Sequence, residues 1–300
     1  MKYYIGIDLG GTKVRVAKVD EEGDIIEEYS DLSHGLEGPK ELILSTIYSL
    51  LDKIQDIKAC EGIGIAVPGP VDTYNKVMPM AVNLVGFKNY PFAKLIEEKY
   101  ELPVYLDNDA NMAGLAEAVL GAGKGKPIVY YLTHSTGIGG ALIVNGKVVS
   151  GQMGYAGEVG NIIIKDNCKK ESEYLNAGAI EAESSGTALA RKASELYGEE
   201  TSTRTLFNNA RNGDLKALAI VDEAAENMGR LLATIGQIVD PHIFVIGGGV
   251  SKDSDLYWPK MIETYHKYFN GIKAAEVVKA KLKEPGVLGA AMLVKEKGNV

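Results

Sequence analysis

One pattern occurs twice in this chain and limits the folds that it can adopt. A β-branched strand runs into a glycine turn, a second strand, a short polar or glycine turn and a third strand, first from Tyr3 and again from Ile128. Alternating apolar residues between such turns predict short antiparallel strands. Two copies of one unit in a single chain predict two related lobes that face each other across a cleft.

Helical patterns occupy the stretches between and after these strands. Apolar residues spaced three and four apart predict a helix over residues 39–54. Strong helix formers predict another over residues 110–120. Beyond Gly186 the chain is expected to be mostly helical, with one apolar strand over residues 242–246. The predicted class is therefore α/β.

The length of 300 residues agrees with two lobes, because chains beyond roughly 250–300 residues tend to split into domains. We expect a small α/β lobe over residues 1–115 and a large α/β lobe over residues 116–285. The last helix, over residues 286–300, is expected to pack back on the small lobe.

Composition excludes several classes of protein. The chain is 46% hydrophobic and 24% charged, which is typical of a globular protein and not of a disordered one. Its net charge of −8 disfavours general nucleic-acid binding. It has neither a secretory pattern at its start nor an apolar run of ~18 residues, so no membrane span is expected. Two cysteines, Cys60 and Cys168, without metal or disulfide spacing fit a reducing cytosol.

The first glycine turn carries groups that suit phosphate. Gly10 and Gly11 allow backbone N–H groups to approach a ligand, Thr12 adds a hydroxyl and Lys13 adds a positive charge. Asp8 stands at the end of the preceding strand, where its carboxylate could hold Mg²⁺ directly or through water. Taken alone, this turn is explained equally well as a plain hairpin.

Two further glycine clusters resemble ligand-binding turns. The stretch over residues 135–140 places Thr136 and Gly137 between two strands. Since GK[ST] is missing and strands follow instead of a helix, it is neither the common phosphate loop nor a dinucleotide fingerprint. Gly248 and Gly249 follow an apolar strand, where bare backbone would let a flat base lie close, although a strand-ending turn explains them equally well.

Several polar side chains outside these turns are candidates for ligand binding or proton transfer. Asp109 follows Asn108 at a strand–helix junction, where a carboxylate can accept a hydroxyl proton and an amide can bind a polyol. A residue of this trio could instead cap the helix. Glu158 lies in a glycine-rich segment without a helical face, which favours a ligand role. Glu181 and Asn83 are candidates that a solvated helix position and a turn position would also explain.

Together these motifs resemble the ROK family of bacterial sugar kinases, named for repressor, open reading frame and kinase. The resemblance covers essentially the whole chain. Five segments carry it: DLGGTK at 8–13, AVPGPVD at 66–72, NLVGF at 83–87, DND at 107–109 and TGIGGALIVNGKVVSGQMGYAGEVG at 136–160. It implies an actin-like, hexokinase-like (ribonuclease H-like) pair of α/β lobes with ATP between them.

The resemblance implies transfer of phosphate from MgATP to the 6-hydroxyl of a hexose, with glucose as the expected substrate. Asp109 would be the general base, and Asp8 would hold Mg²⁺ through water. Sugar contacts would come from polar side chains: Asn83, Asn108, Asp109, Glu158, Asn161 and Glu181. Contacts to ATP would come from the turns: Asp8, Gly10, Gly11, Thr12, Lys13, Thr136, Gly137, Gly248 and Gly249. Phosphoryl transfer depends mainly on positioning and charge neutralisation, which such groups supply.

The sequence departs from zinc-containing members of that family. Those members carry a His after the GExG stretch and then a cysteine cluster. Here Asn161 stands at the His position, Cys168 is the one cysteine left, and Ala179 replaces the last cysteine. One thiolate cannot build a four-ligand site, so no structural zinc is expected. Because the family His also contacts the sugar, N-acetylmannosamine, a β-glucoside or fructose remain alternative substrates.

Two other functions belong among the alternatives. The family includes sugar-sensing repressors, but these carry an N-terminal helix-turn-helix domain, whereas strand residues here begin at Tyr3. A non-sugar ATPase of the actin and chaperone type is disfavoured by GEVG together with DND. The expected protein is a cytoplasmic, homodimeric kinase that binds a hexose and ATP, and binds neither nucleic acid nor membrane.

Overall fold

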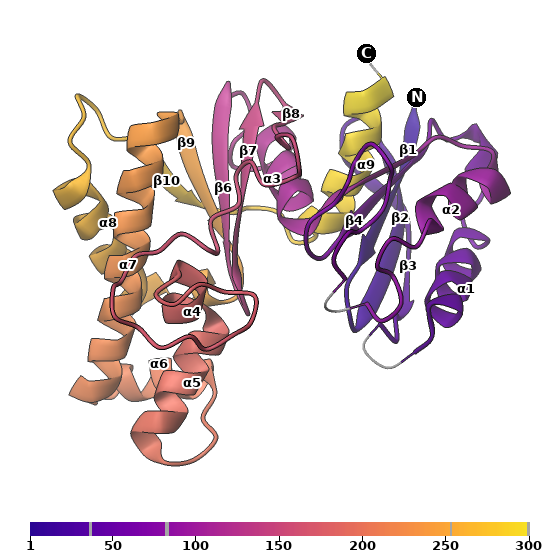
Figure 1. Ribbon diagram of the computed structural model, residues 1–300. Helices are drawn as coiled ribbons and strands as arrows, with labels where there is room; N and C mark the ends of the chain where they lie inside the picture. Colours follow the sequence, from indigo (N-terminus) through magenta and orange to yellow (C-terminus); the bar gives the residue numbers. More distant parts are fainter. Residues whose placement is uncertain (36–37, 82–83, 253, 299–300) are drawn as a thin grey trace. The chain divides into compact units, whose positions relative to one another are not determined.

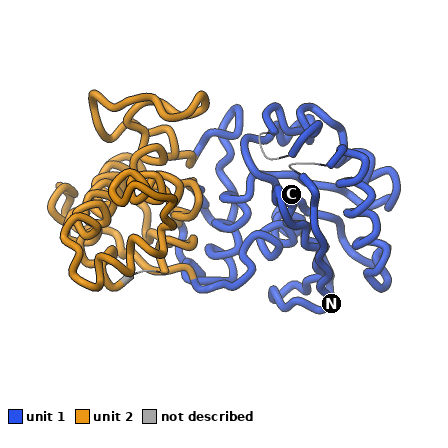
Figure 2. Tube along the Cα trace, turned by 90° about the horizontal axis from the view of Figure 1, so that it is seen from below, with its two compact units in different colours: residues 1–127, 141–156, 281–300 blue, residues 128–140, 157–280 orange. Residues whose placement is uncertain are grey.

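The computed structural model describes most of the chain: residues 1–35, 38–81, 84–252 and 254–298. The chain divides into two compact units (Figure 2). Unit 1 comprises residues 1–127, 141–156 and 281–300, and unit 2 comprises residues 128–140 and 157–280. The expected boundary at residue 115 lies inside a helix of unit 1.

Unit 1 is built on a five-stranded sheet of order β3-β2-β1-β4-β5 (Figure 1). The strands are β1 (Tyr3–Leu9), β2 (Lys13–Asp20), β3 (Ile25–Leu32), β4 (Ile63–Val67) and β5 (Val104–Asn108). The first three pair antiparallel, as the sequence predicts, while β4 pairs parallel with β1 and β5 parallel with β4. Apolar side chains of this sheet form one core with helices α1 (Lys40–Leu51) and α2 (Phe92–Tyr100).

Two helices, α3 (Asp109–Val119) and α9 (Pro285–Gly298), pack together in unit 1, and α9 lies against β1 and β4 (Figure 1). Gly6 and Gly64 are register partners on these two strands. A Cβ on Gly6 would overlap the Val287 carbonyl oxygen, and one on Gly64 would overlap the Ala290 carbonyl oxygen. The bare backbone of the sheet thus admits α9 at very short distance, which places the start of that helix beside the end of β1.

A second five-stranded sheet has the order β10-β9-β6-β7-β8. Its strands are β6 (Ile128–His134), β7 (Ile138–Val144), β8 (Lys147–Val148), β9 (Ile243–Gly247) and β10 (Glu276–Lys279). β6 and β10 both pair parallel with β9, and β7 pairs antiparallel with β8. The chain passes from unit 2 to unit 1 within β7, after Gly140.

The helices of unit 2 lie between β8 and β10 in the chain. They are α4 (Ile180–Ser184), α5 (Gly186–Tyr197), α6 (Thr203–Arg211), α7 (Leu215–Val239) and α8 (Ser254–Tyr268). The long helix α7 packs mainly against α8, and also against α4, α5 and α6. Side chains of Ser185, Ser202 and Asp214 accept hydrogen bonds from backbone N–H groups at the starts of α5, α6 and α7, which is the usual chemistry of a helix N-cap.

Three details of unit 2 differ from the sequence predictions. The predicted turn over residues 135–140 is shorter, because β7 begins at Ile138 and includes Gly139 and Gly140. α6 and β10 were also not predicted from the sequence. Only Leu206, Phe207 and Ala210 of α6 are buried, and β10 has only 4 residues, so neither element carries a long apolar pattern.

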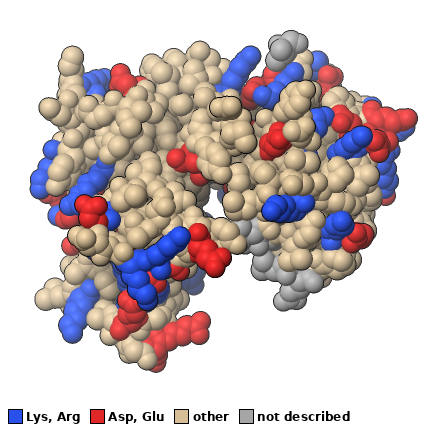
Figure 3. Space-filling view, viewed as in Figure 1, with Lys and Arg blue, Asp and Glu red and all other residues tan. Residues whose placement is uncertain are grey.

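The surface carries both signs of charge. On the face shown in Figure 3, Lys and Arg side chains are interspersed with Asp and Glu side chains, without one dominant basic patch. Among the residues that the structure describes, none of the helices combines the length and the apolar character needed to cross a bilayer.

Candidate active-site groups in each unit

The junction between β5 and α3 in unit 1 is fixed by Asn108. Its Oδ1 accepts hydrogen bonds from the backbone N–H groups of Ala110 at 2.8 Å and Asn111 at 3.3 Å. Its Nδ2 donates to the carbonyl oxygen of Gly69 at 3.0 Å. Asn108 is therefore the N-cap that the sequence predicted within this trio, and it also ties the Gly69 turn to the start of α3.

Asp109 follows as the first residue of α3, and its side chain is exposed. Although solvent reaches it, the carboxylate lies among enough protein atoms that desolvation raises its pKa, and the negative charge of Asp8 raises it further, to about 6. The Ala110 N–H, which donates to Oδ1 at 2.8 Å, opposes this rise. A carboxyl group with a pKa near neutrality is suited to accept a proton during turnover.

Asp107, the first residue of the DND motif, is a supporting residue that the sequence analysis did not single out. It is buried and accepts hydrogen bonds from the Asn108 N–H at 2.7 Å, Asn111 Nδ2 at 2.8 Å and Ser150 Oγ at 3.4 Å. Burial raises the pKa of Asp107, and these donors oppose the rise. The Asp107 side chain thus connects the start of α3, where Asp109 lies, to Ser150.

Asp8 lies in β1 opposite Arg15 of β2 and is half-buried. Burial raises the pKa of Asp8, and the Arg15 guanidinium opposes this. Arg15 itself is held by Glu28 through Nε at 2.8 Å and by Glu284. Gly286, in the first turn of α9, leaves room for the carboxylate, since a Cβ there would lie 2.6 Å from Asp8 Oδ2. Arg15 is not predictable from local sequence, because only the strand register brings it to Asp8.

The first glycine turn closes where the sequence predicted. The Gly10 N–H donates to the Lys13 carbonyl oxygen at 2.9 Å, and residues after β3 donate to the carbonyl oxygens of Thr12 and Gly11 at 2.9 and 3.0 Å. The side chains of Thr12 and Lys13 are exposed. The turn is therefore braced through its carbonyl oxygens, and its hydroxyl and ammonium groups face solvent.

The donor chemistry around Asp8 fits Mg²⁺. The charges of Asp8 and Asp109 are close enough to interact, and both side chains offer the carboxylate oxygens that Mg²⁺ prefers. In the part of the chain that the structure describes, no three His, Cys, Asp or Glu side chains converge as a metal cluster. Mg²⁺ needs no such cage, because it usually keeps several waters and takes one or two carboxylates together with substrate phosphates.

In unit 2, the turn between β6 and β7 consists of Ser135, Thr136 and Gly137. The first residues of α5 hold it: the Gly186 N–H donates to the Ser135 carbonyl oxygen at 2.8 Å, while the N–H and hydroxyl of Thr187 donate to the Thr136 carbonyl oxygen at 3.1 and 3.0 Å. The Thr136 side chain is exposed. As in unit 1, the carbonyl oxygens of the turn accept hydrogen bonds from another segment of the same chain.

Among the other predicted residues of unit 2, Glu181 lies close to that turn. The Glu181 carboxylate accepts a hydrogen bond from the Ile138 N–H at 2.8 Å and lies against Gly137. Gly248 and Gly249 follow β9, and a Cβ on Gly249 would meet no atom within 4 Å. Glu158 is exposed. The structure therefore brings Glu181 to the glycine turn, while the predicted contact of Asn83 lies outside the described residues.

Asn161 has a clear structural contact. Its Nδ2 donates to the Tyr174 carbonyl oxygen at 3.0 Å, and its Oδ1 accepts from the Asn176 N–H at 2.8 Å. The side chain thus closes the segment over residues 161–176. A neutral amide can make this clamp because it is both a donor and an acceptor.

Comparisons with known proteins agree with these motifs. A model of the ROK family matches residues 4–297, which is nearly the whole chain.

The chain belongs to the ROK family.

A glucokinase of Halalkalibacterium halodurans is 31% identical over 99% of this chain and 96% of its own length. The crystal structure of a ROK hexokinase from Thermus thermophilus is 33% identical, covers 99% of both chains and superposes with a TM-score of 0.91. A ROK family glucokinase from Streptomyces griseus, solved in complex with glucose and AMPPNP, is 29% identical over 98% of this chain and 99% of its own, with a TM-score of 0.80. The expected α/β fold of the actin-like, hexokinase-like class is confirmed.

One cysteine, Cys168, is present in the segment that resembles the zinc-binding part of some ROK proteins. Cys168 Sγ lies 3.7 Å from the Asp166 carbonyl oxygen and also contacts the acidic side chain of Glu183. The described residues contain no convergent set of three nitrogen, sulfur or carboxylate ligands at this place, whereas structural zinc takes four.

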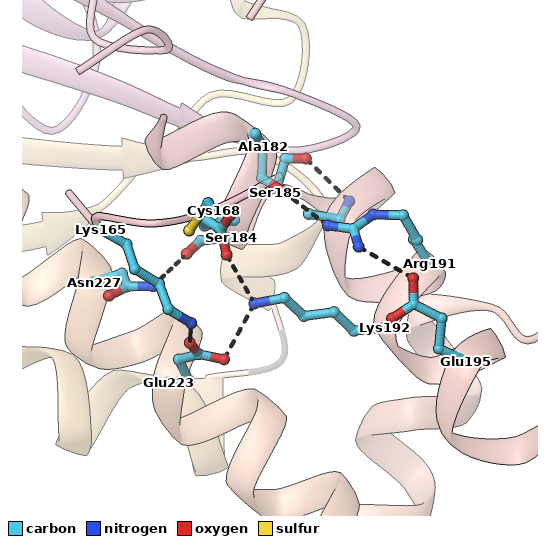
Figure 4. Close-up of polar contacts among 12 residues, drawn as sticks. Lys165, Cys168, Ala182, Ser184, Ser185, Arg191, Lys192, Glu195, Glu223 and Asn227 are labelled. Atoms are coloured by element: carbon cyan, nitrogen blue, oxygen red, sulfur yellow. Dashed lines mark hydrogen bonds and ion pairs between the residues drawn. The ribbon is translucent and has the colours of Figure 1, made fainter. Parts of the chain in front are cut away.

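Charged side chains connect the same segment to the helices of unit 2. Lys165 Nζ lies 2.6 Å from Glu223 of α7, and Lys192 of α5 lies 3.1 Å from Glu223 and 3.4 Å from the buried Glu183 of α4. Figure 4 shows Lys165 and Lys192 directed at the Glu223 carboxylate. In this ROK protein, the Asn161 clamp and this chain of alternating charges together fasten the segment.

Proposed function

We propose that this ROK protein is an ATP-dependent kinase that phosphorylates the 6-hydroxyl of a hexose, with glucose as the substrate. The observation that carries the proposal is Asp109, an accessible carboxylate at the start of α3 with a pKa raised to about 6. The glucokinase and hexokinase relatives support the reaction class. The Streptomyces griseus complex with glucose and AMPPNP supports glucose and an ATP-type nucleotide as the pair of ligands.

Asp109 acts in this proposal as the general base. As the sugar oxygen attacks the γ-phosphorus of ATP, its proton passes to the Asp109 carboxylate, the new P–O bond forms and ADP leaves with the electrons of the broken P–O bond. A base with a pKa of about 6 is mostly ionised at neutral pH and still accepts a proton readily.

The other polar groups act in the proposal by holding the sugar. The Asn108 Oδ1 is committed to capping α3, so its amide nitrogen is the end that would donate to a hydroxyl. Glu158 and Glu181 offer carboxylate oxygens, which accept hydrogen bonds from hydroxyl groups. Asn161 acts through the segment that it closes, and Asn83 is proposed from its motif alone.

ATP is assigned to the glycine turns. Gly10, Gly11, Thr12 and Lys13 in unit 1 would bind phosphates, as would Thr136 and Gly137 in unit 2, and the backbone at Gly248 and Gly249 would contact adenosine. These groups fix the phosphates by hydrogen bonds and by charge, which is what phosphoryl transfer requires. Asp8 would hold Mg²⁺ through water; the ion supplies neutralisation of the charge on the phosphate oxygens.

A panel of sugars tests this proposal directly. The purified protein is incubated with MgATP and glucose, N-acetylmannosamine, fructose or a β-glucoside, ADP release is followed by a coupled assay, and the phosphorylated carbon is identified by NMR. The proposal predicts the highest kcat/KM for glucose and phosphate on its 6-oxygen. Highest turnover of another sugar would revise the substrate alone. If the protein binds a sugar of the panel but releases ADP with none of them, the result would contradict kinase activity and favour a sugar-sensing role.

A further inference from the structure

A buried chain of polar side chains lies behind the Ser135–Gly137 turn. His134, the last residue of β6, is fully buried. Its Nδ1 lies 2.9 Å from the Tyr257 hydroxyl of α8, and its Nε2 lies 2.7 Å from the Ser184 carbonyl oxygen of α4. Ser184 Oγ in turn accepts from Asn227 Nδ2 of α7 at 3.0 Å, a contact drawn in Figure 4. The imidazole of His134 thus connects β6 to α8 and α4, and Ser184 extends the connection to α7.

The direction of each hydrogen bond follows from simple chemistry. A carbonyl oxygen can only accept, so Nε2 of His134 carries a hydrogen and donates to Ser184. Burial lowers the pKa of His134 to about 4, so the ring is neutral and Nδ1 has no hydrogen. The Tyr257 hydroxyl therefore donates to Nδ1. Both ring nitrogens are satisfied in this arrangement, and turning the ring over would leave two buried groups unpaired.

His134 also lies where two nucleotide-assigned turns meet. The next residue, Ser135, begins the turn that carries Thr136. From the other side, Gly248 approaches so closely that a Cβ there would overlap the backbone of His134, and the φ of Gly248 is +95°. The backbone of His134 is thus common to the proposed phosphate turn and the proposed adenosine turn.

We propose that His134 is a positioning residue for the nucleotide: its neutral ring, held by Tyr257 and Ser184, fixes the turn at Ser135–Gly137 against the turn at Gly248. This inference rests on the proposed function, because it takes these turns to bind ATP. Side chains locked by buried hydrogen bonds are the usual means by which a ligand-binding backbone is kept in its productive geometry. Because His134 is fully buried and bonded to Tyr257 and Ser184, its expected effect is on the geometry of the two turns and so on nucleotide affinity.

The chain offers a matched pair of substitutions on one helix. Tyr257→Phe removes the hydroxyl that donates to His134. Tyr265→Phe, also on α8 and also at a fully buried ring, removes a hydroxyl that accepts from the Ala275 N–H at 2.9 Å instead. Tyr257→Phe leaves the buried Nδ1 of His134 without its donor, and Tyr265→Phe leaves the half-buried N–H of Ala275 without its acceptor. Both variants are therefore expected to lower the melting temperature. Only the first loosens the two turns.

The measurements are the Kd of Mg-AMPPNP by calorimetry, the Kd of glucose, and thermal unfolding, for the wild type and each variant. Tyr257→Phe is expected to weaken AMPPNP binding about tenfold, in line with the cost of an unpaired buried acceptor, and to leave glucose binding unchanged. Tyr265→Phe is expected to leave both affinities unchanged. In a His134→Leu background, which also weakens AMPPNP binding, Tyr257→Phe should have no further effect on AMPPNP binding, because the two act through one contact.

Distinct outcomes would overturn the two proposals. Equal AMPPNP affinities in the two tyrosine variants, whether lowered together or both unchanged, would show that the Tyr257–His134 bond has no special role at the turns, while nucleotide binding by the wild type would stand. An additive loss in the His134→Leu background would also contradict the positioning role. A wild-type protein that binds no AMPPNP would instead refute the kinase proposal and, with it, the inference.

Discussion

The pH dependence of turnover tests the environment of Asp109 in quantitative terms. Desolvation, together with the charge of Asp8, raises its pKa to about 6. A general base works only in its ionised form, so kcat/KM should follow the ionised fraction of Asp109. That fraction is about one-half at pH 6 and about one-tenth at pH 5 for this pKa. An Asp with an ordinary pKa would remain about nine-tenths ionised at pH 5.

The assay is glucose phosphorylation measured as kcat/KM from about pH 5 to about pH 8, the range over which such a base changes its ionisation. We expect an acid limb with its midpoint near pH 6 and a loss of about tenfold by pH 5. Circular dichroism at each pH checks that the protein stays folded, and Asp109→Asn should lack the limb. A kcat/KM that stays constant between these limits would refute the reasoning, since it would show a carboxylate that is not perturbed.

Three further predictions concern stability. Asp109→Asn should raise the melting temperature at neutral pH, because a carboxylate whose pKa is raised in the folded state opposes folding when ionised; the difference should shrink as the pH falls through about 6. Gly64→Ala should lower the free energy of unfolding by about 1–3 kcal/mol, since its methyl group would overlap α9. Gly298→Ala, which places a methyl group of α9 in open space, should change the free energy of unfolding little. Equal effects of the two variants in chemical denaturation would contradict the close approach of α9 to the sheet. Lys192→Met should lower the free energy of unfolding by about 1–3 kcal/mol, less than breaking a fully buried pair, whereas Lys58→Met, in an exposed pair, should lower it by under about 0.5 kcal/mol. A similar loss in both variants would contradict the stabilising role of the charged side chains around Glu223. A fall in stability when the wild type is treated with a zinc chelator would contradict it as well.

Local pattern was enough to predict the parts of the fold that depend on neighbouring residues. The hairpin strands of unit 1 and the N-cap at the start of α3 follow from alternation, glycine turns and a polar residue at a strand–helix junction. The predicted placement of Asp8 and Asp109 could rest on the motifs alone. Their electrostatic interaction needs the register of β1 and the position of β5, which no local pattern contains.

Residues that support the site from a distance were not predictable in this way. His134 looks like part of a polar turn in the sequence, yet its partners are 50 and 123 positions away. Arg15 meets Asp8 only through strand pairing. Asn161 was expected to stand at a sugar-contacting position, and its contacts to Tyr174 and Asn176 depend on how the intervening segment folds. Each of these roles is created by tertiary structure.

The most direct test of the account is the separation of binding from turnover in Asp109→Asn. The substitution keeps the size and a hydrogen-bonding oxygen of the side chain but removes its ability to take a proton. The account predicts that kcat for glucose phosphorylation falls about 100- to 10,000-fold, while glucose and Mg-AMPPNP bind with nearly unchanged Kd. Turnover that survives the substitution would contradict the assignment of Asp109 as the base.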